Sequence, residues 1–273
     1  MSKKDIFTPI GLVLSIALVV GSAAMGKAGL GIFYDLPSII IVIFGSFASV
    51  MITFSMEDIK AMPKAIKYSM SMNSISKIEF IQTLKLLSKK ARKDGLLSIE
   101  SDIEKNIQDN FLKKGLRLAI DGVEANTIRE ILEIEISSIE STNARNSKVF
   151  KIWGSLAPAF GMIGTLIGLI QMLADLGNSD EIASGMAVAL ITTFYGSFLA
   201  NVVLNPIGFN IDSKNSTEVY IREMMIEGIL SLQSGESSSI IEERLTSYLT
   251  EDEKKQYYAT VNENPEGDTA NVA

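Results

Sequence analysis

The stretch IWGSLAPAFGMIGTLIGLIQMLA, residues 152–174, is followed seven residues later by IASGMAVALITTFYGSFLANVVLNPIGF, residues 182–209. Neither stretch contains Lys, Arg, Asp or Glu, and each is long enough to cross a hydrocarbon core of about 30 Å as a helix. Gly, Ala, Ser and Thr recur in both, which is typical of membrane helices that pack closely on other helices. These two segments predict a membrane protein.

Two more uncharged stretches, residues 6–25 and 36–55, lie near the start of the chain and bring the number of candidate spans to four. The mean hydropathy of +0.25 agrees with this count. Lys3 and Lys4 before the first stretch and the small residues 21–24 at its end also fit a cleaved signal peptide. The second span follows so soon that a membrane helix is the favoured interpretation.

The distribution of positive charge predicts the topology. Of the 25 Lys and Arg residues, 17 lie between positions 55 and 151, whereas the connector 26–35 has only Lys27 and the connector 175–181 has none. Basic residues remain on the cytoplasmic side of membranes, most reliably near the ends of the spans. We therefore expect both termini and the large loop in the cytoplasm and the two short connectors outside.

The composition argues against several classes of protein. Without Cys or His the chain has no disulfide, no thiol nucleophile and no histidine for acid–base catalysis, and it has no glycine-rich phosphate loop. We expect no enzyme, no resident metal and no cofactor. The net charge of −7 argues against nucleic acid as a partner. None of the spans carries the carboxylate that ion pathways normally contain, so an ion-moving function would need that group from another polypeptide.

The regions between and after the spans are helical by pattern. Apolar residues recur at helical spacing from Ile78 and again from Asn126, where Thr127 and Glu130 have capping-box spacing, and Gly95 is expected to end the first of these helices. Residues 216–231 and 238–249 also have helical patterns. The predicted fold is all-α, a four-helix transmembrane protein with a large helical cytoplasmic loop. Its expected parts are 1–55 (spans one and two), 56–151 (loop domain), 152–209 (spans three and four), 210–261 (C-terminal helices) and 262–273 (disordered tail).

Oxygen-bearing side chains stand out inside the third and fourth spans. Gly161, Gly164 and Gly168 form one small-residue face, for which close helix packing is the simpler interpretation. Hydroxyls at membrane depth come from Thr165, Thr192, Thr193 and Tyr195. They either bond to the backbone one turn back, as Ser and Thr commonly do, or offer ligands to a hard cation such as Na⁺. The spacing alone leaves both interpretations open.

Three segments resemble a known family. Residues 158–169 (PAFGMIGTLIGL) resemble the third span of the flagellar motor stator A subunits, MotA and PomA, and residues 186–196 (MAVALITTFYG) with Asn205-Pro206 resemble the fourth. Residues 92–100 (RKDGLLSIE) resemble the cytoplasmic motif of that family. The wider MotA/TolQ/ExbB family includes ExbB and TolQ, which have three spans and an outside N-terminus, so the count of four favours the stator.

The resemblance implies a specific assembly. A homopentamer would surround a dimer of a MotB/PomB-like partner, which supplies the intramembrane aspartate and an anchor to peptidoglycan. Flow of Na⁺ or H⁺ across the bacterial plasma (inner) membrane would drive rotation of the A-subunit ring. The cytoplasmic loops would then push on the rotor protein FliG, for motility and chemotaxis.

The resemblance also implies roles for individual residues. Arg92 and Glu100 match charged residues that engage the rotor, and Glu135 matches a further acidic position. Pro158 and Pro206 match two prolines tied to torque generation, and a proline in a span frees a carbonyl and bends the helix.

The threonines bear on the choice of ion. Thr165 and the pair Thr192-Thr193 resemble sodium-driven members, whereas proton-driven members often have Ala at the position of Thr165. Because Na⁺ needs several oxygen ligands, we expect Na⁺ coupling with a transient site at Thr165 and Thr193.

Two other function classes stay open. The first is an ion-driven energiser of envelope processes of the ExbB/TolQ kind, for which an N-terminus outside the cell would be evidence. The second is a passive scaffold or receptor, which would show no ion dependence.

Overall fold

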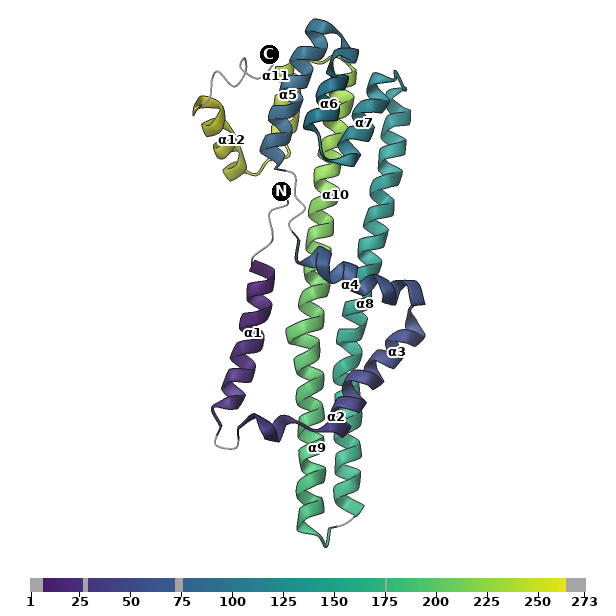
Figure 1. Ribbon diagram of the computed structural model, residues 1–273, viewed down its shortest axis with the longest axis vertical. Coiled ribbons are helices and arrows are strands. Elements are labelled where there is room, and N and C mark those ends of the chain that lie inside the picture. Colours follow the sequence, from purple (N-terminus) through teal and green to yellow (C-terminus); the bar gives the residue numbers. More distant parts are fainter. Residues whose placement is uncertain (1–6, 27–28, 72–75, 175, 264–273) are drawn as a thin grey trace. The chain divides into compact units, whose positions relative to one another are not determined.

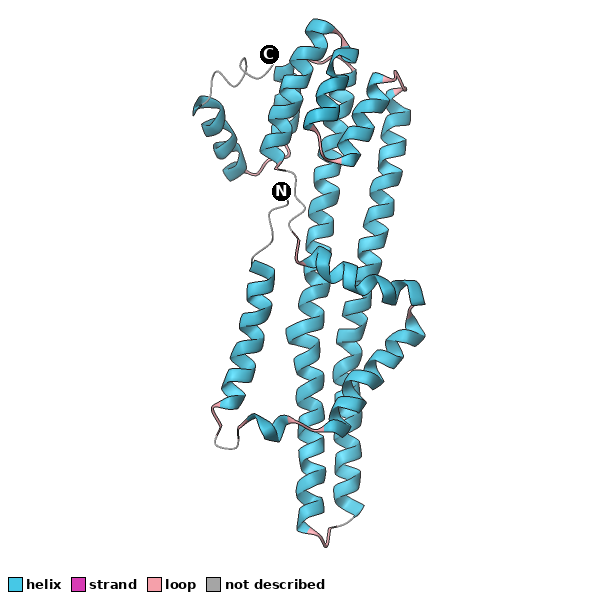
Figure 2. Cartoon of the chain, viewed as in Figure 1, coloured by secondary structure: helices cyan, strands magenta, loops and turns pink. Residues whose placement is uncertain are grey.

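The structure is a computed structural model that describes residues 7–26, 29–71, 76–174 and 176–263, and in this part of the chain it contains helices and loops but no β-strand (Figure 2). The all-α prediction is confirmed. In chain order the elements are α1 (Phe7–Ala24), the 3₁₀ helix η1 (Leu30–Phe33), α2 (Leu36–Ile39), the π-helical η2 (Ile40–Gly45), α3 (Ser46–Thr53), α4 (Met56–Ser69), α5 (Lys77–Asp94), the 3₁₀ helix η3 (Leu96–Ile99), α6 (Glu100–Asn106), α7 (Asn110–Ile120), α8 (Ala125–Ala174), α9 (Ser179–Phe198), the π-helical η4 (Leu199–Leu204), α10 (Asn205–Gln233), α11 (Ser238–Thr246) and α12 (Glu251–Glu263).

Four helical stretches are long and apolar enough to cross a membrane, as predicted. The first is α1, and the second runs from Leu36 to Thr53 through α2, η2 and α3. The third is the apolar end of α8. The fourth begins with α9 and continues through η4 into α10, so that a π-helical segment lies directly before Asn205-Pro206.

The chain divides into two compact units. The first unit comprises the described parts of residues 1–73 and 141–215, and the second those of 74–140 and 216–273 (Figure 1). Helices α8 and α10 each contribute residues to both units. The sequence-based boundaries at 151/152 and 209/210 therefore fall inside continuous helices, because a helix need not end where its composition changes from charged to apolar.

Within the first unit, polar contacts fix the register of α8 against α10. The buried Asn143 donates its Nδ2 hydrogen to Oδ1 of Asn215 over 3.1 Å, and the hydroxyl of Ser147 donates to the carbonyl oxygen of Gly208 over 2.9 Å. An apolar cluster then joins α4 to both helices, with members Ala65, Phe150, Leu204, Ile207 and Ile211.

The second unit has its own apolar core, to which α5, α6, α7, α11, α12 and its parts of α8 and α10 contribute. Gly95, with φ of +87°, ends α5 as expected, because only glycine adopts this conformation readily. The helices predicted at 216–231 and 238–249 are confirmed by α10 and α11.

Two expectations about helix ends differ from the structure. Helix α8 already begins at Ala125, so Thr127 lies in its first turn and is not the capping residue. Helix α12 extends to Glu263, into the segment 262–273 expected to be disordered, and the rest of that segment lies outside the described residues, as do Lys3 and Lys4.

Candidate functional site

The seam between α8 and α9 is closed by glycines whose backbones touch. A Cβ atom placed on Gly168 would lie 2.5 Å from the carbonyl oxygen of Gly185, and one placed on Gly185 would lie 2.6 Å from the carbonyl oxygen of Gly168. One placed on Gly161 would lie 2.9 Å from the carbonyl oxygen of Thr192. No side chain larger than hydrogen fits at these approaches, so the packing interpretation of the small-residue face is confirmed.

Two of the predicted threonines meet across this seam. Oγ1 of Thr165 lies 2.5 Å from Oγ1 of Thr193, and both hydroxyls lie close to the carbonyl oxygen of Ala189, at 3.0 Å and 3.2 Å. The Thr165 hydroxyl is also 3.0 Å from the carbonyl oxygen of Gly161. We call Thr165 Oγ1, Thr193 Oγ1 and Ala189 O the oxygen cluster. Thr193 is exposed and Thr165 half-buried, so the cluster lies on the outer surface of the chain.

Thr192 is placed differently from its neighbour. It is fully buried, and its hydroxyl donates to the carbonyl oxygens of Val188 and Ala189 on its own helix, at 2.8 Å and 3.1 Å. This is the backbone bonding that threonine commonly makes one turn back in a helix. Its carbonyl oxygen packs on Gly161, so Thr192 shapes the seam from inside.

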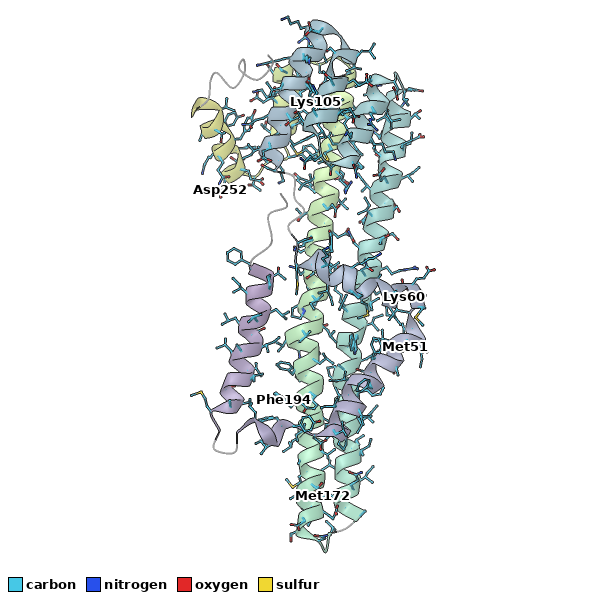
Figure 3. The ribbon with its side chains drawn as sticks, in the orientation of Figure 1. Met51, Lys60, Lys105, Met172, Phe194 and Asp252 are labelled. Atoms are coloured by element: carbon cyan, nitrogen blue, oxygen red, sulfur yellow. The ribbon has the colours of Figure 1, made fainter. Side chains whose placement is uncertain are left out.

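Tyr195 points away from the oxygen cluster. It follows Thr193 by two residues, a rotation of about 200° on an α-helix, and its hydroxyl donates to the carbonyl oxygen of Phe33. Its ring lines a mostly apolar cavity of about 250 Å³ between α1, η1 and α9, together with Val20, Phe198 and Phe194, the last of which is labelled in Figure 3. The structure therefore does not bring Tyr195 together with the threonines.

Pro158 and Pro206 both lie near the contact between Gly154 of α8 and Asn205 of α10. Pro158 leaves the carbonyl of Gly154 without its usual amide donor, as any helical proline does four residues earlier. The side chain of Asn205, directly before Pro206, packs against Gly154. A Cβ atom on Gly196 would also lie 3.0 Å from Cα of Pro158. The irregular stretches of α8 and α10 thus touch each other.

The charged residues predicted to engage the rotor lie in the second unit. Arg92, at the end of α5, and Glu100, at the start of α6, are both exposed, and neither has an ion-pair partner among the described residues. Lys90 and Asp102 hold the turn between these helices through a 2.8 Å ion pair. Glu135 is instead paired with Lys114 at 2.7 Å. Arg92 and Glu100 are therefore available to a partner, whereas Glu135 already has one.

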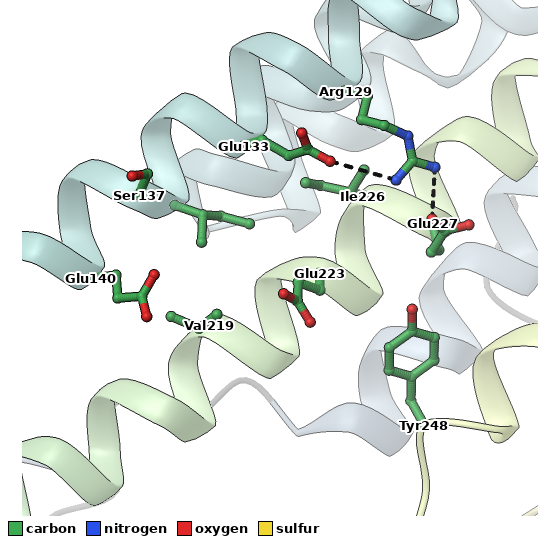
Figure 4. A pocket seen from close by; sticks show the side chains of 10 residues that line it. Arg129, Glu133, Ser137, Glu140, Val219, Glu223, Ile226, Glu227 and Tyr248 are labelled. Carbon is green, nitrogen blue, oxygen red and sulfur yellow. Dashed lines mark hydrogen bonds and ion pairs between the residues drawn. The ribbon is translucent and has the colours of Figure 1, made fainter.

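A pocket of about 370 Å³ in the second unit was not predicted from the sequence (Figure 4). Its lining comes from α8, α10 and the residues after α11, and includes Arg129, which contacts Glu227 at 2.7 Å and Glu133 at 3.8 Å. Burial raises the pKa of the Tyr248 phenol, and the negative charges of Glu227 and Glu223 raise it further. No residue predicted to be functional lines this pocket.

Comparison with known proteins connects these features. The sequence profile of the MotA/TolQ/ExbB proton channel family matches residues 103–224, and that of the motility protein A N-terminal region matches residues 9–95. Motility protein A of Borreliella burgdorferi is 38% identical over 92% of this chain and 96% of its own length. Chemotaxis protein PomA of Vibrio alginolyticus is 33% identical over 90% of this chain and 96% of its own length.

A solved structure has the same fold. A chain of the flagellar MotAB stator complex from Bacillus subtilis superimposes with a TM-score of 0.83 at 32% identity, covering 91% of this chain and 98% of that one. The family consists of membrane ion channels and not of enzymes. The similarity covers nearly the whole chain, from the first span to the C-terminal helices, and the four apolar helices fit a multi-pass membrane protein. The chain belongs to the MotA/TolQ/ExbB family, in its motility protein A group.

Proposed function

We propose that this chain is the A-type stator subunit of a flagellar motor, which couples cation flow across the plasma membrane to torque on the rotor. The observation that carries the proposal is the match to a MotAB stator chain over 91% of this sequence. We propose that both termini and the second unit lie in the cytoplasm, because 17 of the 25 Lys and Arg residues lie between positions 55 and 151.

The ion pathway requires a second polypeptide. The four apolar stretches predicted to cross the membrane contain no carboxylate, and the oxygen cluster faces outward from this chain. A MotB/PomB-like partner would supply an intramembrane aspartate next to the exposed side of the oxygen cluster. Five copies of this chain around two of the partner is the assembly that the stator resemblance implies.

We further propose that Na⁺ is the coupling ion. The oxygen cluster presents three oxygens separated by 2.5 to 3.2 Å. Na⁺ is a hard cation of about the size of Ca²⁺, whose oxygen ligands lie about 2.3–2.6 Å away, so it could contact all three oxygens at once. A partner carboxylate and water would complete the shell. A proton would need none of these oxygens.

Torque would leave the chain through the second unit. Arg92 and Glu100 are exposed on neighbouring helix ends and are free to pair with opposite charges on FliG. The contact of Asn205 with Gly154 supports the proposal that the prolines Pro158 and Pro206 move together when the ion passes.

Swimming speed tests both the stator assignment and the choice of Na⁺ as the coupling ion. Stator-deleted cells with a compatible rotor would receive this gene and its cognate partner, and Na⁺ would be titrated at fixed pH. We expect speed to rise with Na⁺ and to vanish without it. Swimming indifferent to Na⁺ would keep the stator and make the ion a proton. No swimming, with both chains in the membrane, would favour the ExbB/TolQ-like energiser.

A pair of variants isolates the oxygen cluster. Thr165→Ala removes one of its three oxygens, so we expect a higher Na⁺ requirement or no Na⁺-driven swimming. Thr53→Ala is the matched control, because Thr53 is exposed in another span and its hydroxyl only donates to the carbonyl of Ser49, at 3.0 Å. Unchanged Na⁺ dependence in Thr165→Ala would refute the sodium site while leaving the stator assignment intact.

A further inference from the structure

Helix α4 is fixed at both ends. The Ser55 hydroxyl accepts a hydrogen bond from the amide of Asp58 over 3.3 Å, and the Asp58 carboxylate accepts one from the amide of Ser55 over 3.1 Å, which is a complete capping box. At the other end, the Lys214 ammonium donates to the carbonyl oxygens of Ser69 and Ser71, the latter at 2.8 Å. The first turn of the helix is therefore closed by its own cap, and its last turn is held by Lys214 of α10.

One face of α4 packs on the ends of the membrane spans. Its Ala65 is buried, and Met62 and Ile66 pack with it against Phe150 of α8 and Ile207 of α10. Helix α4 crosses α8 and α10 instead of running along them (Figure 1). Since it starts three residues after the second span ends at Thr53, α4 lies at the depth where hydrocarbon gives way to lipid headgroups.

The opposite face of α4 carries three lysines. Lys60, Lys64 and Lys67 are spaced by four and three residues, so they lie along one side of the helix, and all three are exposed (Figure 3 labels Lys60). Among the described residues none of them has an ion-pair partner. The neighbouring Lys151, by contrast, is paired with Asp212.

We propose that Lys60, Lys64 and Lys67 form a binding site for the headgroups of anionic phospholipids. An interfacial helix with an apolar inner face and lysines on the outer face attracts anionic lipid through its charge. The position of α4, one short turn after a span, keeps these lysines at the membrane surface. This inference is independent of the ion that the protein conducts.

The single tryptophan provides the measurement. Trp153 packs against the same apolar cluster as α4, and its Nε1 donates to the Ser46 hydroxyl over 2.9 Å. The purified full-length chain would be reconstituted in phosphatidylcholine vesicles that contain either brominated phosphatidylglycerol or brominated phosphatidylcholine. Quenching of Trp153 by each lipid gives their relative binding constant beside this helix.

About a fivefold factor per lysine is typical near an anionic surface, so we expect a preference for phosphatidylglycerol of at least tenfold. The triple variant K60Q/K64Q/K67Q should lower this preference to near one. The control K93Q/K105Q/K255Q makes the same change of charge on exposed lysines of the second unit and should retain it. Equal quenching of all three proteins by brominated phosphatidylcholine verifies insertion.

Two results would overturn the proposal. One is a wild-type preference near one, and the other is a triple variant that keeps the wild-type preference. If the triple variant fails to insert, Lys64→Gln alone should lower the preference two- to fivefold, and an unchanged value there would equally refute the site.

Discussion

Replacing Gly168 by Ala would test whether backbone contact between α8 and α9 positions the oxygen cluster. The new methyl group would lie 2.5 Å from the carbonyl oxygen of Gly185 and 2.8 Å from the amide nitrogen of Ala189. Both are backbone atoms of α9, so neither can rotate away as a side chain could. For Gly185 to reach ordinary contact at 3.4 Å, α9 must recede by about 0.9 Å.

That displacement has a stability cost and a functional one. Overpacking of this kind typically costs about 1–3 kcal/mol of unfolding free energy. Ala189, which supplies one oxygen of the cluster, lies on the helix that must move. If it recedes by the same amount, the 3.0 Å hydrogen bond from Thr165 is lengthened beyond the range of a hydrogen bond.

Gly11→Ala in α1 is the matched control, because a Cβ atom there would meet nothing within 4 Å. Thermal unfolding of the purified full-length proteins in detergent measures the first effect, and swimming of complemented cells measures the second. We expect Gly168→Ala to lower the Tm by several degrees and to reduce swimming, and Gly11→Ala to do neither. A Gly168→Ala protein that matches the control in both assays would refute the argument that glycine contact closes the seam.

Two further predictions concern the docking of α12. Tyr257→Ala removes a fully buried ring, at a cost of about 3–5 kcal/mol, and should expose α12 to limited proteolysis. Tyr257→Phe keeps the ring and loses the contacts of the hydroxyl, which donates to Glu242 over 2.6 Å and accepts from Lys85 over 3.3 Å, so it should stay more resistant than Tyr257→Ala. Equal cleavage of Tyr257→Ala and wild type would contradict this. Burial raises the pKa of Glu253, but hydrogen bonds from the Thr250 amide and from Lys77 outweigh it and hold this pKa below its ordinary value of 4.5. The ionised Glu253 carboxylate thus stabilises the docked α12 above pH 4.5, and this stabilisation is lost as the pH falls through the lower pKa of the folded state. Cleavage of α12 should therefore increase in acid, and Glu253→Gln should remove that increase.

The membrane spans could be predicted from the sequence because an uncharged stretch of that length has few alternatives. The close packing at the glycines of residues 161–168 could also be predicted, because small residues at helical spacing in a membrane span commonly allow another helix to approach. Spacing alone could not show that Thr165 meets Thr193, because their contact depends on the register of α9 against α8; a site shared by these two threonines was expected only from the family resemblance. The register is set by the close approach of Gly168 to Gly185.

Other features depend on tertiary packing that composition does not reveal. The sequence places Tyr195 close to Thr193 and so predicts that both belong to the ion pathway. Two residues along an α-helix correspond to a rotation of about 200°, so Tyr195 lies on the opposite side of α9 from Thr193. The loop domain was expected to begin at residue 56, but α4 belongs to the first unit because its apolar face packs on Phe150 and Ile207. A change from apolar to charged composition within α8 and α10 marks a change of surroundings and not the end of a helix.

The π-helical segment η4 gives the fourth span one residue more than an α-helix of the same rotation would contain. Deleting one residue between Leu199 and Leu204 would therefore restore α-helical bonding and leave α10 close to its present rotation, with Asn215 and Gly208 still facing Asn143 and Ser147. A deletion between Gly208 and Asn215 removes a residue from regular α-helix instead, and would turn Asn215 by about 100° away from Asn143 while Gly208 keeps its contact with Ser147. The same one-residue deletion should thus be tolerated within η4 and disruptive a few residues later.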